Sequence, residues 1–212
     1  MKRLFAGALL ASLFLLAFSA HAQSDTYKEG THYFKLDKPL KTSTGDKIEV
    51  RELFWYGCPH CFSLEPFVVK WLENKPANAE FVATPAVFSK RWVFHAKAYY
   101  TIKALGLEEK GHPLIFDAIH LKKEPIGNVK NLSALLNENF GTDPEVVKNT
   151  ISSFAVDSNV RAANSISVKS GANGVPTLIV DGKYRLSAQS AGGNAGVFDL
   201  VNFLVEKAQS ER

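Results

Sequence analysis

The chain has 212 residues, a formal net charge of +4 and a hydrophobic fraction of 46%. This length is enough for one core, or for one domain with an insertion. Without Lys2 and Arg3 the 25 basic residues fall to 23, against 21 acidic ones, and no basic stripe runs along the chain. The charge pattern therefore does not indicate a nucleic-acid-binding protein, and no nucleic acid is expected as a partner.

Residues 1–22 predict a signal peptide. Lys2 and Arg3 form a basic start, residues 4–18 are apolar, and Ala20-His21-Ala22 is a small-x-small cleavage pattern. An uncleaved membrane anchor is the alternative, because the apolar run is nearly long enough to span a bilayer. The mature chain, from about residue 23, is expected to be exported and soluble.

Two strands are predicted before the first cysteine, at residues 31–36 and 48–56, with a turn at 42–46 between them. Alternation along the second strand places five side chains on one face: Ile48, Val50, Glu52, Phe54 and Tyr56. Glu52 is an acid in phase with an apolar stripe. Either it is buried for a chemical reason, or it lies at a strand end or a solvated edge.

The only two cysteines of the chain form the motif Cys58-Pro59-His60-Cys61, at the predicted junction of this strand with a helix. The N-terminus of a helix stabilises a thiolate through its free N–H groups and its dipole. Pro59 suits the first helical turn, and His60 adds a cation or a donor beside the sulfur. Cys61 lies one turn further on, so it can form a disulfide with Cys58.

Three other interpretations of the cysteine pair are open. As a structural disulfide it would close a four-residue loop, which is worth only about 2 kcal/mol. As half of a zinc site it lacks a second pair, since structural zinc needs four ligands. Two inert thiols are the third possibility, and the strand–turn–helix context argues against them. A redox role is the best interpretation, with no metal and no cofactor beyond the disulfide itself.

The helix from Cys58 contains Pro66, which should kink it, and it ends at Lys75-Pro76. A strand at 80–88 follows, in which Pro85 indicates an edge position or a boundary. Strand patterns then disappear, and five helices are predicted at 92–105, 113–121, 131–140, from Asp143-Pro144 onward, and 157–170. Trp92 and His95 are expected to pack on a helix face, and His32, His112 and His120 are isolated.

Strands return at 174–180, and Asp181-Gly182 predicts a two-residue hairpin into Lys183 to Leu186. A helix at 197–207 ends the chain. This order of elements resembles a thioredoxin fold with a helical insertion, and the resemblance implies an α/β protein with a thioredoxin-like domain at 23–90 and 164–212 and an all-helical insertion domain at 91–163.

The element order and particular residues resemble the DsbA family, exported thiol–disulfide oxidases with a thioredoxin fold and a helical insertion. Cys58-Pro59-His60-Cys61 is similar to the family's active site, and Val175-Pro176 matches its cis-proline loop. Glu52 matches its buried acid, and Glu65 aligns with a further acid. Some members carry a lysine near the buried acid. This sequence departs from that pattern, because Ala83 or Thr84 stands there.

The resemblance implies a catalytic set of Cys58, Cys61, His60, Pro59 and Glu52, with Val175 and Pro176 binding the substrate backbone. It implies a monomer in the periplasm that donates its Cys58–Cys61 disulfide to unfolded exported proteins with free thiols. A DsbB-type membrane quinone reductase would reoxidise it. On spacing alone Pro176 would be trans. The alternatives are an exported isomerase or reductase on the same fold, and a binding module with an incidental disulfide.

Overall fold

The computed structural model describes residues 26–212. The predicted signal peptide at 1–22 lies outside these residues. Within the described part of the chain, no helix is both long and apolar enough to cross a membrane.

The centre of the molecule is a five-stranded mixed sheet in the order β1-β5-β4-β2-β3. Its strands are β1 (Phe34–Lys35), β2 (Ile48–Phe54), β3 (Ala79–Pro85), β4 (Thr177–Val180) and β5 (Tyr184–Leu186). β2 runs parallel to β3, whereas the β1–β5, β2–β4 and β4–β5 pairs are antiparallel. All seven residues of β2 are buried, because this strand lies between two neighbours and is covered on both faces.

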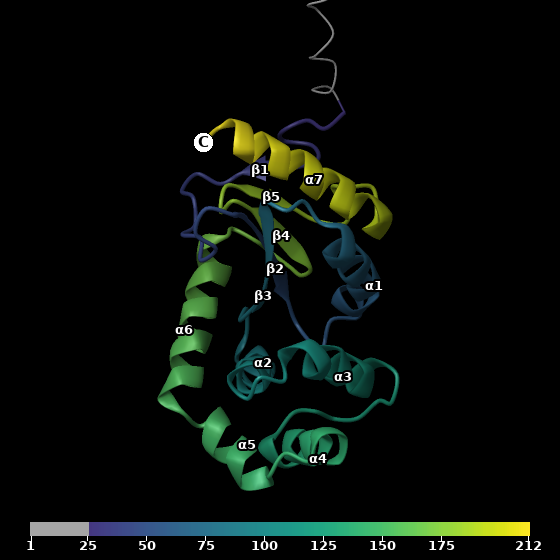
Figure 1. Ribbon diagram of the computed structural model, residues 1–212, viewed down its shortest axis with the longest axis vertical. Coiled ribbons are helices and arrows are strands. Elements are labelled where there is room, and N and C mark those ends of the chain that lie inside the picture. Colours follow the sequence, from purple (N-terminus) through teal and green to yellow (C-terminus); the bar gives the residue numbers. More distant parts are fainter. Residues whose placement is uncertain (1–25) are drawn as a thin grey trace, which may run out of the picture.

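Helices cover both faces of the sheet and one of its ends (Figure 1). α1 (Pro59–Asn74) and α7 (Asn194–Ser210) pack together on one face, and the long α6 (Phe154–Lys169) contacts β3 from the other. Four more helices form a layer beyond the lower end of β2: α2 (Val93–Ala104), preceded by the 3₁₀ turn Lys90–Trp92, α3 (Glu108–His120), α4 (Val129–Phe140) and α5 (Pro144–Ile151). α3 contacts α1, so this layer reaches the redox motif.

Two large apolar clusters divide the core. The first lies between the sheet, α1 and α7, and includes Ile48, Val50, Trp71 and Val201. The second joins the end of β2 to the helical layer and contains Phe54, Tyr56, both cysteines and side chains of α2 to α5. The cysteine pair is thus built into the core that connects the sheet with the helical layer.

Several helix ends, turns and strand positions predicted from the sequence are confirmed. Gly141 ends α4 in the left-handed region with φ 66°, and the Asp143 side chain accepts a hydrogen bond from the Glu145 N–H at the start of α5. Asp181 and Gly182 both have positive φ, 52° and 65°, as a two-residue hairpin turn requires. β3 is an edge strand, and Pro85 is its last residue.

Several element boundaries were predicted wrongly. The strands expected at 31–36, 48–56 and 174–180 are shorter, since ladder pairing covers only Phe34–Lys35, Ile48–Phe54 and Thr177–Val180. The helix expected from Pro113 begins at Glu108, because a proline in the second turn leaves the preceding turn free to form. α6 begins at Phe154, where the Ser153 side chain caps the Val156 N–H. The division into domains at 91 and 163 stays a prediction, and α6 runs through the second boundary.

Candidate redox site

The two cysteines lie where β2 gives way to α1. Cys58 is the N-cap of α1 with extended backbone angles, and Pro59 occupies the first helical position as predicted. The Cys58 N–H donates to the Trp55 carbonyl at 2.9 Å, which fixes the turn before the helix. The two thiols are free in this structure, so the geometry is that of the dithiol form.

The environment of Cys58 favours a thiolate. A hydrogen bond from the Cys61 thiol is the main cause that lowers the pKa of Cys58 to about 6, opposed by burial and helped by the backbone N–H groups of Cys61 and His60 and by the charge of the His60 side chain. No acidic side chain occupies the first turn of α1, so nothing there opposes the helix dipole. Cys58 is 7% exposed, whereas Pro59 and His60 lie on the surface.

Cys61 has the opposite character. It is fully buried, and burial is the main cause that raises the pKa of its thiol, followed by the hydrogen bond to Cys58 and the charge of Glu52. Cys61 is therefore held as a neutral thiol, and the pair is strongly asymmetric. A low-pKa sulfur at a helix N-terminus next to a protonated, buried one is the arrangement of a redox pair rather than of two inert thiols.

Glu52 lies in the core beside this pair. Its exposed fraction is 1%, so the alternative of a solvated edge is wrong. One carboxylate oxygen, Oε1, has no hydrogen-bond partner, and its neighbour across the β2–β3 ladder is the neutral Ala83. Burial raises the pKa of Glu52 well above its usual range, and the charges of Glu65 and Cys58 add to this effect. A carboxyl group in this state holds a proton at neutral pH.

The loop before β4 lies against the reactive sulfur. The Cys58 Sγ donates a hydrogen bond to the Val175 carbonyl oxygen at 3.4 Å, although 117 residues separate them in sequence. The Val175–Pro176 peptide bond is cis, as the family resemblance implied and as spacing alone did not. Pro176 is buried and Val175 is partly exposed.

Sequence reasoning missed the contribution of α3 to the site. His112, Phe116 and His120 follow one another at intervals of four on one helix face, and this spacing was the available signal. The His120 Nε2 lies 2.7 Å from the Tyr56 carbonyl oxygen, and the His112 Nδ1 lies 2.8 Å from the Tyr56 hydroxyl. His112 and His120 thus hold the turn before Cys58. The prediction that these two histidines are isolated is therefore wrong.

Trp92 and His95 pack as the sequence predicted. The Trp92 ring stacks on Trp55 with centroids 4.5 Å apart, and the His95 Nε2 lies 2.9 Å from the Ile126 carbonyl oxygen. Burial lowers the pKa of His95, so its ring is neutral. Both rings pack against Trp55 and help to fix its position.

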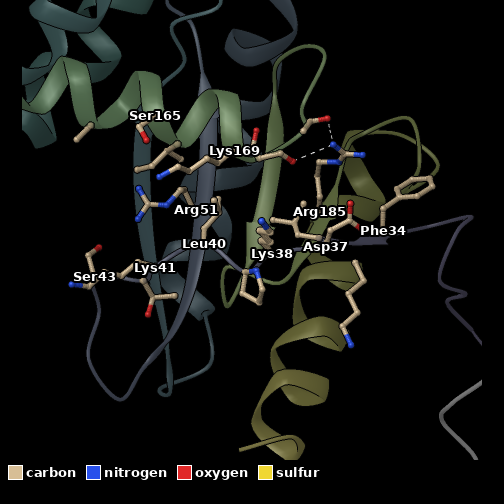
Figure 2. A pocket seen from close by; sticks show the side chains of 18 residues that line it. Phe34, Asp37, Lys38, Leu40, Lys41, Ser43, Arg51, Ser165, Lys169 and Arg185 are labelled. Carbon is tan, nitrogen blue, oxygen red and sulfur yellow. Dashed lines mark hydrogen bonds between the residues drawn. The ribbon is translucent and has the colours of Figure 1, made fainter.

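Two pockets lie near the sheet. One, of about 1440 Å³, lies between residues 34–43 and α6, is lined by Lys38, Lys41, Arg51 and Lys169 among others, and contains none of the predicted site residues (Figure 2). The other, of about 600 Å³, opens between α1, β3, α2 and α3, beside Ala83. Within residues 26–212 no group of three or more histidine, cysteine or acidic side chains could hold a metal ion.

Known proteins with sequences similar to this chain are thiol:disulfide interchange proteins. A family model described as a DSBA-like thioredoxin domain matches residues 93–204. The thiol:disulfide interchange protein DsbA of Pseudomonas aeruginosa is 37% identical over 210 residues, which cover 99% of this chain and 98% of that protein. DsbA of Azotobacter vinelandii is 34% identical over 213 residues, with 99% of each chain covered.

Solved structures show the same fold. The crystal structure of Pseudomonas aeruginosa DsbA matches with a TM-score of 0.83 at 37% identity and covers 89% of this chain and 97% of that one. The oxidoreductase DsbA of Xylella fastidiosa matches with a TM-score of 0.78 at 27% identity, over 84% of this chain and 95% of that one. The mixed sheet with its helical insertion is therefore the thioredoxin fold predicted from the sequence.

Proposed function

Because this chain belongs to the DsbA family and is a disulfide-forming thiol–disulfide oxidoreductase, we propose that Cys58 is its nucleophilic sulfur and that the Cys58–Cys61 disulfide is what it donates. The asymmetry of the two thiols supports this assignment. Cys58 has a pKa of about 6 and lies at the start of α1, whereas Cys61 is buried and protonated.

The reaction proceeds in two exchanges. A client thiolate attacks the Cys58 sulfur, the Cys58–Cys61 bond breaks, and the Cys61 sulfur leaves and takes up a proton. A second client thiolate then attacks the client sulfur of this mixed disulfide, and Cys58 leaves as a thiolate. The client loses two electrons and gains a disulfide, while the pair gains both electrons. A stabilised Cys58 thiolate makes the second exchange fast, because a leaving group of low pKa leaves faster.

Three other residues have supporting roles in this proposal. His60 and the N-terminus of α1 stabilise the Cys58 thiolate. Glu52, which holds a proton beside Cys61, supplies it to the departing Cys61 sulfur. The Val175 carbonyl, in contact with the Cys58 sulfur, accepts a hydrogen bond from the backbone of the client when the client displaces the thiol.

The substrates, partners and location follow from the same proposal. Clients are unfolded exported proteins with free thiols, and the protein acts as a monomer in the periplasm after removal of residues 1–22. A DsbB-type membrane quinone reductase restores the disulfide, and no cofactor other than Cys58–Cys61 takes part. An exported isomerase or reductase would need a less oxidising pair.

Equilibration with glutathione tests the proposal. The redox potential of the Cys58–Cys61 pair should be more oxidising than that of a thioredoxin-type reductase. The oxidised protein should also oxidise a reduced, unfolded client stoichiometrically. Cys61→Ser should accumulate a mixed disulfide through Cys58, whereas Cys58→Ser should form none. A strongly reducing pair, or trapping through Cys61, would contradict the assignment.

A further inference from the structure

Two acidic side chains, Glu52 and Glu65, interact near the redox cysteines, and among residues 26–212 neither forms an ion pair with a lysine or an arginine. Glu52 is buried with one unpartnered oxygen, and the negative charge of Glu65, on α1, acts on it. Among residues 26–212 the ion-pair partner of Glu65 is His112, whose Nε2 lies 3.6 Å from the Glu65 Oε1. Both side chains are mostly buried, with exposed fractions of 16% and 15%. Within the described residues, His112 is thus the group placed to bring a positive charge to Glu65.

The other side of the His112 ring contacts the turn before Cys58. The Tyr56 hydroxyl lies 2.8 Å from Nδ1, and burial raises the pKa of Tyr56, so this hydroxyl stays protonated. When Tyr56 donates to Nδ1, a neutral His112 carries its proton on Nε2, toward Glu65. A second proton on the ring requires the Tyr56 hydroxyl to rotate and accept. The neutral and the protonated form of His112 therefore differ in the hydrogen bond that Nδ1 makes with Tyr56 and in the charge that Nε2 presents to Glu65.

Other charged and polar side chains face the same pocket as His112 from α1, α2 and α3. From α2, Lys103 pairs with Glu108 at 3.2 Å, and the Tyr99 hydroxyl donates to the same carboxylate. Glu109, on α3 itself, lines the same pocket, as does Glu73 of α1.

Aromatic rings enclose the imidazole on its other sides. The Phe54 and Phe116 rings pack edge-on against it, with centroids 4.8 and 5.2 Å away. The charge of His112 is therefore directed toward Glu65.

The pocket of about 600 Å³ connects this group with solvent. Glu65, His112 and Ala83 all line it, and Ala83 is the ladder neighbour of Glu52. Through this opening solvent reaches Glu65 and His112, whereas Glu52 is 1% exposed and is not among the residues that line the pocket.

We propose that His112 is a positioning residue that sets the charge of Glu65 and, through it, the ionisation of Glu52 and the redox equilibrium of the Cys58–Cys61 pair. This inference deepens the proposed function. When a client reduces the disulfide by two electrons, Glu52 gives its proton to the Cys61 sulfur, and solvent replaces that proton. A protonated His112 offsets the negative charge of Glu65, which favours the Cys58 thiolate and hence the reduced form. The Cys58–Cys61 pair is therefore a stronger oxidant when His112 is protonated than when it is neutral.

The test compares the equilibrium constant with glutathione at pH 6 and pH 8 in the wild type, His112→Gln and a matched control, His95→Gln. His95 is half-buried near the same turn, with its ring centroid 5.8 Å from that of Trp55, and because burial lowers its pKa its ring is neutral. We expect His112→Gln to be a weaker oxidant by about three- to tenfold at pH 6 and to match the wild type within about twofold at pH 8. His95→Gln should change the constant equally at both pH values.

A second variant keeps the test decisive if His112→Gln folds poorly. Glu65→Gln should remove the same pH dependence, and the double variant should show no further change, because the two residues act through one charge. If His112→Gln shifts the equilibrium constant equally at both pH values, His112 has only a packing role. If the constant is unchanged, His112 has no influence on the redox equilibrium. Either result overturns the proposal. A wild type that fails to oxidise clients would instead refute the proposed function, since the pH coupling is measured without a client.

Discussion

The sulfur of Cys58 and the carbonyl oxygen of Val175 lie 3.4 Å apart, in hydrogen-bond contact. They come from opposite halves of the chain, one from the β2–α1 turn and the other from the loop before β4. A peptide that reacts with Cys58 must enter between them, and its backbone N–H can replace the thiol as donor to Val175. Recognition would then depend on the client's main chain and would tolerate many side chains.

N-methylation of a client peptide tests this role of Val175. A methyl group on the backbone nitrogen next to the client cysteine removes a donor, and one lost hydrogen bond of about 1 kcal/mol should slow mixed-disulfide formation about fivefold. Stopped-flow fluorescence with peptides methylated at this position and at a position five residues away measures the difference. Equal rates would show that the client does not bond to Val175.

Alkylation should distinguish the two cysteines. In the reduced protein at pH 6, iodoacetamide is expected to label Cys58 and to leave Cys61 unlabelled, because Cys58 is half ionised there and Cys61 is a buried thiol. Peptide mapping after brief labelling gives the ratio, and the urea-unfolded protein serves as the control in which both react alike. Preferential labelling of Cys61 would reverse the assigned roles.

Replacement of His60 by leucine should raise the pKa of Cys58 by about half to one unit. The side chain contributes its charge, whereas its backbone N–H remains in place, so the pKa should stay below that of a free cysteine. Thiolate absorbance titrated in both proteins measures the change, with His32→Leu as a distant control. An unchanged pKa would remove the His60 side chain from the mechanism.

Glu52→Gln should stabilise the oxidised protein at pH 7 by about 1–3 kcal/mol, because the folded protein keeps Glu52 protonated at a pH where the unfolded chain ionises it, and glutamine does not carry this cost. The folded pKa of Glu52 is raised, so its contribution is most favourable below the unfolded pKa and is lost as pH increases. The gain should therefore nearly vanish at pH 4. Urea unfolding at both pH values measures it, and Glu80→Gln, which removes an exposed partner of Lys47, should show no gain.

Redox state and stability should be linked through Cys58. Closing the four-residue loop favours the oxidised form by about 2 kcal/mol, and the thiolate favours the reduced form by roughly 1.4 kcal/mol at pH 7 for a folded pKa of about 6. The folded pKa is depressed, so this stabilisation is complete above the unfolded value of about 8.5 and is lost as pH falls through the folded value. Reduced and oxidised forms should then be equally stable slightly above pH 7.

Denaturant unfolding of both redox forms between pH 5 and pH 8.5 measures this crossover. The oxidised form should be the more stable one at pH 5, and the reduced form should gain steadily up to pH 8.5. Above about pH 8.5 the unfolded chain ionises Cys61 while the folded protein, which raises its pKa, keeps it protonated, so the reduced form should lose stability there. An oxidised form that stays more stable at every pH would indicate a structural disulfide.

Local signals in the sequence predicted most of the fold. The cysteine motif, the capping residues and the hairpin each depend on near neighbours, and so did the helix ends at Gly141 and Asp143. The burial of Glu52 was predicted as one of two alternatives, because strand alternation fixes a face and does not say what covers it. The contacts of His112 and His120 with Tyr56 depend on how α3 crosses the β2–α1 turn, and no local pattern encodes that crossing.

Tyr56 is held at both ends by α3, through its hydroxyl and through its carbonyl, two residues before the reactive sulfur. The helical insertion therefore helps to position the redox centre and does more than cover it. A chain shortened to the sheet with α1, α6 and α7 would retain the four-residue motif but lose the clamp that orients it. The packing of α3 against this turn therefore bears directly on the chemistry of Cys58.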